Sequence, residues 1–236
     1  MNISGSTALV TGANRGMGRH FAQQLLERGA AKVYATARTP ELVDIPGVEV
    51  LRLDVTDPAS VAAAAHAAQD VTLLINNAGT ATRQNLVAGD LDQIRLEMET
   101  NFFGPLNMIR AFAPALARNG GGAVLNLLSA LSWTSYDGAN AYATAKAAAW
   151  SLTNGVRLEL IGQGTSVTGL VVGSVDTDMM AGYDVEKSDP ADVVRAALDG
   201  VEARAFEVLA DEVSIQLKAA LSADPSALYP QAVPAA

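Results

Sequence analysis

The sequence predicts an α/β fold: a single domain built on a doubly wound parallel sheet with helices on both faces. Short apolar runs alternate with longer segments rich in helix-forming residues, which is the pattern of repeated strand–helix units. Several of the runs are apolar almost throughout, as expected for strands that are buried on both faces. The 236 residues contain no linker and no internal repeat, so one domain is the simplest organisation.

Seven apolar runs are expected to form strands. They are Thr7–Val10, Lys32–Thr36, Val48–Leu53, Val71–Ile75, Ala123–Leu128, Ser166–Val172 and Phe206–Leu209. Five segments between or after them are expected to form helices, because they are rich in Ala, Leu, Gln, Glu and Arg. They are Arg19–Arg28, Ser60–Gln69, Leu91–Arg118, Ala139–Leu160 and Pro190–Val201.

The flanking residues agree with these assignments. Gly29 is a typical helix stop, and Asp57 followed by Pro58 is a typical helix start. A further helical, acidic stretch follows Leu209. The tail from Ala223 to Ala236 is rich in Pro and Ala, and we expect it to be irregular with disordered last residues.

Composition excludes several classes of function. The chain has no cysteine, only two histidines and a net charge of −9, which argues against disulfides, a multi-histidine metal site and nucleic-acid binding. No signal peptide is evident at the N-terminus, and there is no run of ~18 apolar residues that would span a membrane. We therefore expect a cytoplasmic protein with neither metal nor membrane partner.

A glycine-rich turn follows the first strand, in the stretch TGANRGMG from Thr11 to Gly18. Glycines at 12, 16 and 18 lack Cβ atoms, so the turn can be tight and its backbone can approach a pyrophosphate. The next helix would present free N–H groups and its positive dipole end to the phosphates. The position between a strand and a helix supports a dinucleotide site, whereas three glycines alone could serve the turn geometry only.

The end of the second strand indicates which dinucleotide binds. Enzymes that prefer NAD place a carboxylate near this point to bind the ribose 2′-hydroxyl, but this chain has Ala37 followed by Arg38. A guanidinium can bind a 2′-phosphate bidentately, and Arg15 in the glycine turn could approach it from the other side. The sequence therefore predicts NADP(H), unless both arginines are merely solvated.

A tyrosine and a lysine four residues apart form the candidate catalytic pair. Tyr142 and Lys146 share one face of a predicted helix. An ammonium beside a phenol lowers the pKa of the phenol, which would suit Tyr142 for proton transfer to a carbonyl oxygen or from an alcohol. Ser129, at the end of the fifth strand, could bond the same oxygen; Ser132 and Ser135 are rivals for that role.

Taken together, these motifs resemble the short-chain dehydrogenase/reductase family. The glycine turn, Asn76-Asn77-Ala78-Gly79, Asn101, Ser129 and the Tyr142–Lys146 pair occur in that family's order and approximate spacing, from Ser6 to about Thr177. The resemblance implies a compact Rossmann-like fold and hydride transfer with NADP(H). One departure is Val172-Gly173, where the family usually has Pro-Gly.

The resemblance also implies residue roles. Tyr142 would be the general acid/base, Lys146 would tune it and bind the nicotinamide ribose, Ser129 would orient the substrate, and Asn101 would hold a water that relays protons. Asp54 would meet the adenine amino group, and Asn76 and Gly79 would shape the cofactor floor. The full set expected at the cofactor is Gly12, Asn14, Arg15, Gly16, Met17, Gly18, Ala37, Arg38, Asp54, Val55, Asn77, Ala78, Gly79, Tyr142, Lys146, Gly173, Val175 and Thr177.

The substrate pocket is expected beside the catalytic pair. In this fold its borders are the segment between Ser129 and Tyr142 and a lid of about twelve residues after Thr177. The lid is short, so we expect a wide, aromatic-lined pocket, and the candidate wall residues are Trp133, Tyr136, Met179 and Tyr183. Of the remaining polar candidates, His20 and His66 are expected to be surface or helix-packing residues, whereas Glu97 and Glu99 are expected to be solvated, because residues two apart on a helix do not face each other.

Four possible functions are considered. The leading one is a carbonyl reductase or alcohol dehydrogenase that acts on a ketone or secondary alcohol. A second is a 3-oxoacyl-carrier-protein reductase, although the chain lacks the glycine-rich ending and the basic rim expected of one. A non-catalytic cofactor-binding sensor is disfavoured by the complete catalytic set, and a sugar epimerase by length and glycine spacing. The resemblance further implies a homo-oligomer, dimer or tetramer, while the natural substrate stays open.

Overall fold

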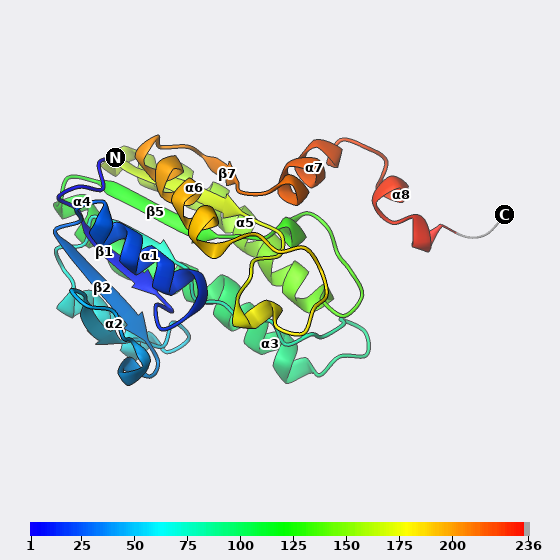
Figure 1. Ribbon diagram of the computed structural model, residues 1–236, viewed down its shortest axis with the longest axis horizontal. Coiled ribbons are helices and arrows are strands. Elements are labelled where there is room, and N and C mark those ends of the chain that lie inside the picture. The colour runs from blue at the N-terminus through cyan, green and yellow to red at the C-terminus, as the bar shows by residue number, and fades with distance from the viewer. Residues whose placement is uncertain (234–236) are drawn as a thin grey trace.

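The computed structural model describes residues 1–233 and confirms the predicted α/β fold. One parallel sheet holds seven strands in the order β3-β2-β1-β4-β5-β6-β7 (Figure 1). Their bounds are β1 Thr7–Thr11, β2 Lys32–Ala37, β3 Glu49–Arg52, β4 Leu73–Asn76, β5 Gly122–Leu127, β6 Thr165–Val171 and β7 Glu207–Leu209. The order reverses between β1 and β4, where the carboxyl ends of both strands open a crevice for ligands.

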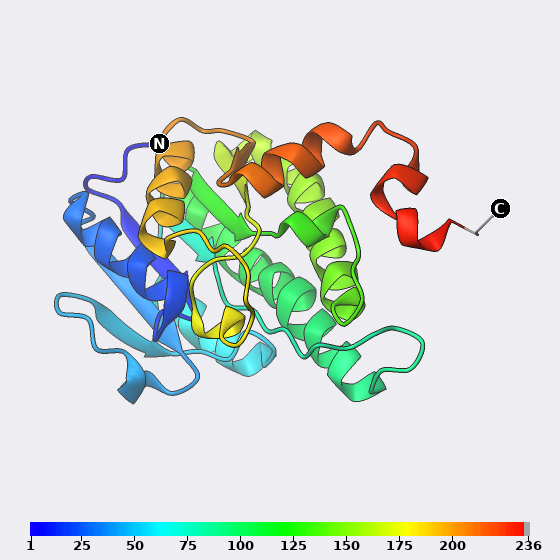
Figure 2. The ribbon, with the colours of Figure 1, turned by 45° about the vertical axis from the view of Figure 1, so that its right-hand side comes forward.

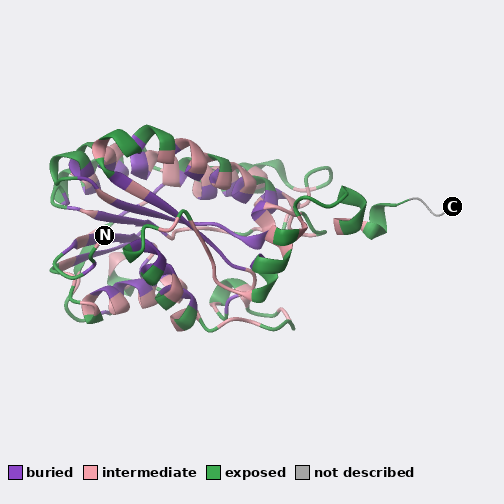
Figure 3. Ribbon diagram, turned by 90° about the horizontal axis from the view of Figure 1, so that it is seen from above, coloured by how far each residue is buried: buried purple, intermediate pink, exposed green. Residues whose placement is uncertain are grey.

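Helices cover both faces of this sheet, with exposed outer surfaces and buried inner ones (Figures 2 and 3). Their bounds are α1 Gly16–Glu27, α2 Pro58–Ala67, α3 Leu91–Met98, α4 Gly104–Arg118, α5 Asn140–Leu160, α6 Pro190–Glu202, α7 Glu212–Ala220 and α8 Pro225–Leu228. Asp57 caps α2 by accepting a hydrogen bond from the amide of Ala59, as the Asp-Pro start predicts.

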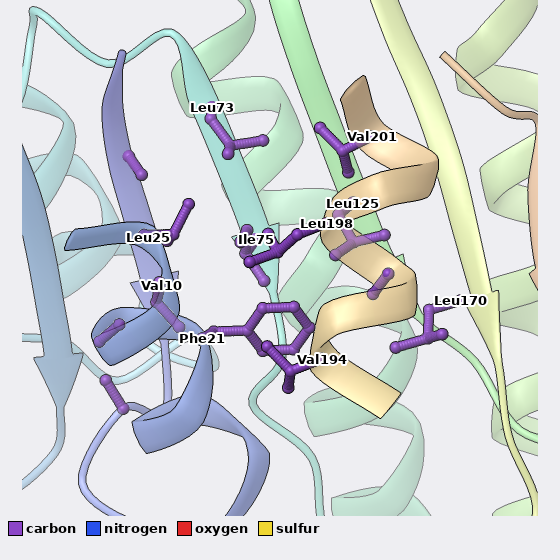
Figure 4. Packing of buried hydrophobic residues seen from close by; sticks show 14 of the residues in the cluster. Val10, Phe21, Leu25, Leu73, Ile75, Leu125, Leu170, Val194, Leu198 and Val201 are labelled. Carbon is purple, nitrogen blue, oxygen red and sulfur yellow. The ribbon is translucent and has the colours of Figure 1, made fainter. Parts of the chain in front are cut away.

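One face of the sheet packs against α1 and α6. Phe21 of α1 and Val194 of α6 meet over the sheet, and Val10 and Ile75 lie beneath them (Figure 4). The other face packs against α2, α4 and α5, and Phe112 of α4 is fully buried there. Because neighbouring residues of a strand face opposite sides, both faces need apolar side chains, which explains the continuous apolar runs.

The long predicted helix Leu91–Arg118 is divided in the structure. A π-helical segment, Glu99–Phe103, separates α3 from α4. Pro105 has no N–H group, so the carbonyl of Asn101 has no donor four residues later. The Asn101 side chain in turn donates to the carbonyls of Thr80 and Glu97, at 2.8 and 2.9 Å. The prediction of one continuous helix was therefore wrong, and the break falls at a candidate site residue.

Two other boundaries differ from expectation. Helix α1 begins at Gly16 rather than at Arg19, so two glycines of the turn belong to the first helical turn. The C-terminal tail is not wholly irregular, since α8 and the 3₁₀ turn Pro230–Ala232 lie within it. Helices α7 and α8 form an arm that extends away from the sheet (Figures 1 and 2). The predicted disorder at 234–236 lies outside the described residues.

Candidate active site

The glycine turn joins β1 to α1 at the crevice. Gly12 and Gly16 have φ angles of +68° and +51°, a region that L side chains rarely adopt. A Cβ on Gly18 would collide with the carbonyl oxygen of Gly12 and would lie 2.5 Å from Nδ2 of Asn77. The Arg15 side chain does not cap α1, so the first N–H groups of the helix have no side-chain partner at that position. The turn is therefore a backbone cradle suited to an anion.

The side chains of Thr11, at the end of β1, and of Asn77, just after β4, hold this turn in place. Nδ2 of Asn77 donates to the carbonyls of Thr11 and Gly12, at 2.8 and 3.1 Å. The hydroxyl of Thr11 accepts from the amides of Asn77 and Ala78, both at 2.9 Å. Asn76 turns the other way and donates to Asn126 of β5 at 2.8 Å. The two asparagines of this motif thus fix the crevice from both sides.

A cavity of about 530 Å³ extends from the turn along the carboxyl ends of β2 and β3; we call it the glycine-turn cavity. The expected cofactor residues that line it are Gly12, Asn14, Arg15, Gly16, Met17, Ala37, Arg38, Asp54, Val55, Asn77, Ala78, Gly79 and Thr177. Gly18 lies behind the turn instead. The sequence did not indicate Thr39, Leu42 and Thr100, which also line the cavity.

The two arginines expected at a 2′-phosphate are both exposed at this cavity. Arg38 follows Ala37 at the end of β2. Nη1 of Arg15 lies 3.3 Å from Oδ2 of Asp178, and both side chains are about two-thirds exposed. An exposed pair of this kind contributes little stability, so a phosphate could replace the carboxylate at small cost.

A second cavity of about 590 Å³, the Tyr142 cavity, adjoins the first and shares Asn77, Gly79 and Thr177 with it. Ser129, Tyr142, Lys146, Gly173 and Val175 line it, so strands and helices far apart in sequence converge here. Two adjoining cavities of this size can hold an extended ligand in the first and a smaller reactant in the second, next to the end of that ligand.

Ser129 and its rivals occupy different places. Ser129 lines the Tyr142 cavity and begins a short 3₁₀ turn, where its hydroxyl accepts from the amide of Leu131 at 3.1 Å. The hydroxyl of Ser132 accepts from the Ser129 amide at 3.3 Å. The amide of Ser135 donates to the hydroxyl of Tyr229 in the C-terminal arm. Neither rival lines the cavity, which favours Ser129.

The electrostatics of the Tyr142–Lys146 pair differ from the sequence-based expectation. Burial raises the pKa of Tyr142 above its ordinary value, a contact with Ser129 opposes the rise, and the charge of Glu97 adds to it. Burial lowers the pKa of Lys146 to about 8. Nζ of Lys146 lies 5.5 Å from the Tyr142 ring centre and donates to the carbonyl of Leu127 at 2.8 Å. Desolvation thus outweighs the expected lowering of the phenol pKa by the ammonium.

Asn101 lines neither cavity but lies next to Gly79, which lines both. A Cβ on Gly79 would be 2.9 Å from Oδ1 of Asn101 and 3.9 Å from Nζ of Lys146. The absence of a side chain at Gly79 therefore lets Asn101 and Lys146 approach each other. Because Pro105 has no N–H group, the main-chain carbonyl of Asn101 cannot accept the usual helical hydrogen bond from the residue four positions on.

Only some of the residues predicted to form the substrate pocket line the Tyr142 cavity. Tyr136, Met179 and Tyr183 line it, but Trp133 does not. The Trp133 ring packs with Leu128 and Ala149 and lies 4.8 Å from Nζ of Lys218, because α7 covers it. The sequence missed two apolar wall residues, Val213 and Leu217 on α7, since nothing in their local pattern places the arm at the cavity.

A buried carboxylate stands close to this site. Glu97 was expected to be solvated with Glu99, but its side chain is 0% exposed, whereas Glu99 is exposed. Helix α3 packs against α5, and that contact encloses Glu97. The expectation for Glu97 was wrong because this position lies on the face of α3 that packs into the molecule.

Within residues 1–233, no helix combines the length and apolar character needed to cross a membrane. The same part of the chain holds no cluster of three or more His, Cys, Asp or Glu side chains that could bind a metal ion.

Known proteins resemble this chain in both sequence and fold. A family model described as short chain dehydrogenase matches residues 6–188. The chain is 34% identical over 190 residues to a 3-oxoacyl-[acyl-carrier-protein] reductase of Vibrio cholerae, covering 76% of this chain and 77% of that protein. A short chain dehydrogenase from Burkholderia cenocepacia, solved in complex with NADP, matches with a TM-score of 0.94 and 40% identity over 99% of this chain and 100% of that one. A short-chain dehydrogenase from Sphingobium yanoikuyae in complex with NADPH gives a TM-score of 0.80 at 27% identity, covering 98% and 97%.

Proposed function

The chain belongs to the short-chain dehydrogenase family, and from this premise we propose that it is an NADPH-dependent reductase of ketones that also runs in the reverse direction. The observation that carries the proposal is the convergence of Ser129, Tyr142 and Lys146 on one cavity, next to the glycine turn. A cofactor-binding sensor without catalysis would not need that arrangement.

The residues present fit NADP(H). Gly12 and Gly16 line the glycine-turn cavity without side chains, Gly18 lets the turn pack tightly behind them, and the cavity runs toward Arg38. Arg15 and Arg38 would bind the 2′-phosphate, and no carboxylate stands at Ala37 to repel it. The relatives from Burkholderia cenocepacia and Sphingobium yanoikuyae, solved with NADP and NADPH, support the same choice.

NADPH, when bound, supplies the hydride that adds to the carbonyl carbon. The protein's own part is to control the oxygen of the substrate. The Ser129 hydroxyl would donate a hydrogen bond to it, and the Tyr142 phenol would transfer its proton to it as negative charge develops. Because the pKa of Tyr142 is raised, the phenol is in its proton-donating form at neutral pH, which suits reduction.

Lys146 and Asn101 would restore that proton. Lys146 lies beside the phenol on the same helix face, and its low pKa of about 8 makes loss of a proton accessible near neutral pH. A water held beside Asn101 would connect the ammonium to solvent.

The substrate is proposed to be a bulky, partly aromatic ketone. Tyr136, Tyr183 and the two methionines of the lid offer broad apolar surface, and Val213 and Leu217 of α7 extend it. A small aliphatic ketone would leave much of a 590 Å³ cavity unfilled.

A second candidate is reduction of a 3-oxoacyl group on a carrier protein, which the 34% identity to the Vibrio cholerae enzyme favours. Two features of this chain oppose it. Strand β7 is followed by Asp211 and Glu212 of α7 at the cavity, and the net charge of −9 offers no basic rim to an acidic carrier.

The experiment is a panel of aliphatic, aryl and diaryl ketones with NADPH and with NADH, read by cofactor absorbance, with a 3-oxoacyl-carrier protein alongside. We expect the highest kcat/KM for an aryl ketone with NADPH. Faster reduction of the carrier-bound substrate would instead select the second candidate.

A further inference from the structure

Most of the segment 173–177 lines the Tyr142 cavity, just after β6 ends. Hydride transfer needs the nicotinamide beside Tyr142, so we call this segment the nicotinamide loop. Strand β7 runs alongside β6 and ends near the start of the loop, where α7 begins the C-terminal arm (Figure 1). The contact between this loop and α7 has no part in the chemistry described so far.

The start of the nicotinamide loop departs from the hydrogen-bond ladder between β6 and β7. In that ladder the amide of Gly169 donates to the carbonyl of Phe206, at 3.0 Å. The bonds of a parallel ladder repeat every two residues on both strands, so the amide of Gly173 would next meet the carbonyl of Ala210. It donates instead to Oδ2 of Asp211, at 2.6 Å. The side chain of Asp211 thus takes the place of a main-chain acceptor.

The two oxygens of the Asp211 carboxylate hold two different segments. Oδ2 accepts from the amide of Gly173, while Oδ1 accepts from the amide of Ser214 at 2.8 Å and so caps the start of α7. A carboxylate accepts stronger hydrogen bonds than a neutral carbonyl does. One side chain therefore joins the first residue of the nicotinamide loop to the first turn of α7.

Close packing supports the same connection. A Cβ on Gly173 would lie 3.0 Å from Oδ2 of Asp211 and 3.3 Å from the Cβ of Val213, so α7 approaches the loop as closely as a glycine allows. Val213 and Leu217 are four residues apart on one face of α7, and both line the Tyr142 cavity. The contact that holds the loop thus also holds an apolar wall of the cavity.

The neighbouring anchors of the loop are of another kind. The carbonyl of Val172 accepts from the amide of Ala130, and the carbonyl of Ser174 accepts from the amide of Ser188, both at 2.9 Å. These are main-chain bonds, which a change of side chain leaves available. The anchor at Gly173, by contrast, depends on one side chain and can be removed by substitution.

We propose that Asp211 is a positioning residue of the active site: it fixes the nicotinamide loop against α7, so that the nicotinamide and the apolar wall keep one spacing. This inference rests on the proposed function, which places the nicotinamide beside Tyr142. The ketone must fit between these two surfaces, and a small displacement of either one lowers the rate of hydride transfer. Both oxygens of Asp211 are engaged, so it acts through the loop and not on the substrate.

The decisive variant is Asp211→Ser. Its hydroxyl can still cap α7, but a single, shorter oxygen cannot also hold Gly173. Calorimetry gives the Kd for NADPH and for adenosine 2′,5′-bisphosphate, which has the adenine half without the nicotinamide. Loss of a charge-assisted bond should raise the Kd for NADPH about fivefold to tenfold and leave that for the bisphosphate within about twofold. At saturating NADPH, single-turnover reduction of an aryl ketone should slow by at least about tenfold.

Ser214→Ala is the matched control for the helix cap. Ser214 is 0% exposed and its hydroxyl donates to the Asp211 carbonyl at 2.9 Å, so its loss weakens the same cap without removing the bond to Gly173. It should lower the melting temperature but change the ratio of the two Kd values, and the rate, by less than about twofold. Equal rises of both Kd values in Asp211→Ser, or the same change of ratio in Ser214→Ala, would reduce Asp211 to a helix cap and overturn the proposal.

A measurement on the wild-type protein keeps the test open even if Asp211→Ser does not fold. Hydrogen exchange of single amides, followed by NMR, should be slow at Gly173 and fast at Gly182, an exposed glycine of the lid. Exchange at Gly173 as fast as at Gly182 would overturn the role of Asp211. The expected Kd ratio in a protein that reduces no ketone would reject the proposed function alone.

Discussion

Nζ of Lys146 donates a hydrogen bond to the carbonyl oxygen of Leu127, at 2.8 Å, from a side chain that is 5% exposed. The ammonium is thus held by one backbone dipole and not by a carboxylate, since no ion pair in the described chain includes it. Burial without a counter-ion lowers the pKa of Lys146 to about 8. Burial of this lysine without a counter-ion therefore costs stability.

Because the buried lysine lowers stability, the variant Lys146→Met should be more stable than wild type, by an amount that depends on pH. The folded pKa of about 8 lies below the unfolded value of 10.5, so the unfolded chain binds more protons between them. Wild-type stability therefore rises with pH across that window, by at most about 3 kcal/mol, whereas methionine has no such dependence. The melting temperature of Lys146→Met, measured without cofactor, should exceed that of wild type most at pH 7 and least at pH 10. A difference that stays constant over this range would show that Lys146 is not desolvated; Lys187→Met serves as the part-exposed control.

Cofactor preference should reverse when the end of β2 is changed. Ala37→Asp with Arg38→Gln adds a carboxylate that repels the 2′-phosphate and removes a guanidinium that binds it. A charge-assisted bond contributes ~1.5–3 kcal/mol, so the NADPH-to-NADH ratio of kcat/KM should fall at least about tenfold. Arg52→Gln is the matched control, because Arg52 pairs in register with Ala37 but lines neither cavity. Equal ratios in the double variant and wild type would mean that the phosphate binds elsewhere.

The glycine turn should tolerate no side chain at Gly18. In Gly18→Ala the new Cβ would meet the Gly12 carbonyl and the Asn77 amide, which are both fixed by the turn. We expect dinucleotide affinity, measured by calorimetry, to fall by at least about tenfold. Gly155→Ala on α5 meets nothing within 4 Å and should bind NADPH normally. Normal binding by Gly18→Ala would show that the turn can relax.

The sequence predicted most of the sheet and of the motif positions because those features are local. Apolar runs, glycines at a strand–helix turn and a Tyr-x-x-x-Lys pair can each be recognised within a few residues. The burial of Glu97 could not be, since it depends on the packing of α3 against α5, two helices far apart in sequence. The π segment Glu99–Phe103 was missed as well. Helix periodicity continues through that segment and conceals the break.

The other differences between the predicted and the observed site arise because residues far apart in sequence meet in the fold. Trp133 lies between Ser129 and Tyr142 in sequence, as a pocket residue should, but α7 returns from the far end of the chain and covers it. The same return brings Val213 and Leu217 to the cavity. The pKa of Tyr142 also depends on long-range placement. The spacing between Tyr142 and Lys146 can be recognised in the sequence, but the pKa of the phenol is set by its burial and by nearby charges, which depend on the surrounding fold.

Substrate size should depend on Tyr183 and not on Trp133. Tyr183 lines the Tyr142 cavity, and its ring lies 4.5 Å from the guanidinium carbon of Arg83. Tyr183→Ala should lower kcat/KM for a diaryl ketone roughly threefold to tenfold relative to a small aliphatic one, because apolar contact is lost. Trp133→Ala should lower the melting temperature through a cavity under α7 but leave that ratio unchanged. The reverse pattern would place the substrate against Trp133.

We expect the Tyr142 hydroxyl to supply the proton for carbonyl reduction. Tyr142→Phe removes that oxygen and keeps the ring, so the measurement is single-turnover oxidation of bound NADPH by an aryl ketone, beside NADPH affinity by calorimetry. The affinity should stay within about threefold of wild type, and the rate should be lower by at least about a hundredfold. An unchanged rate in Tyr142→Phe would show that the proton comes from another group.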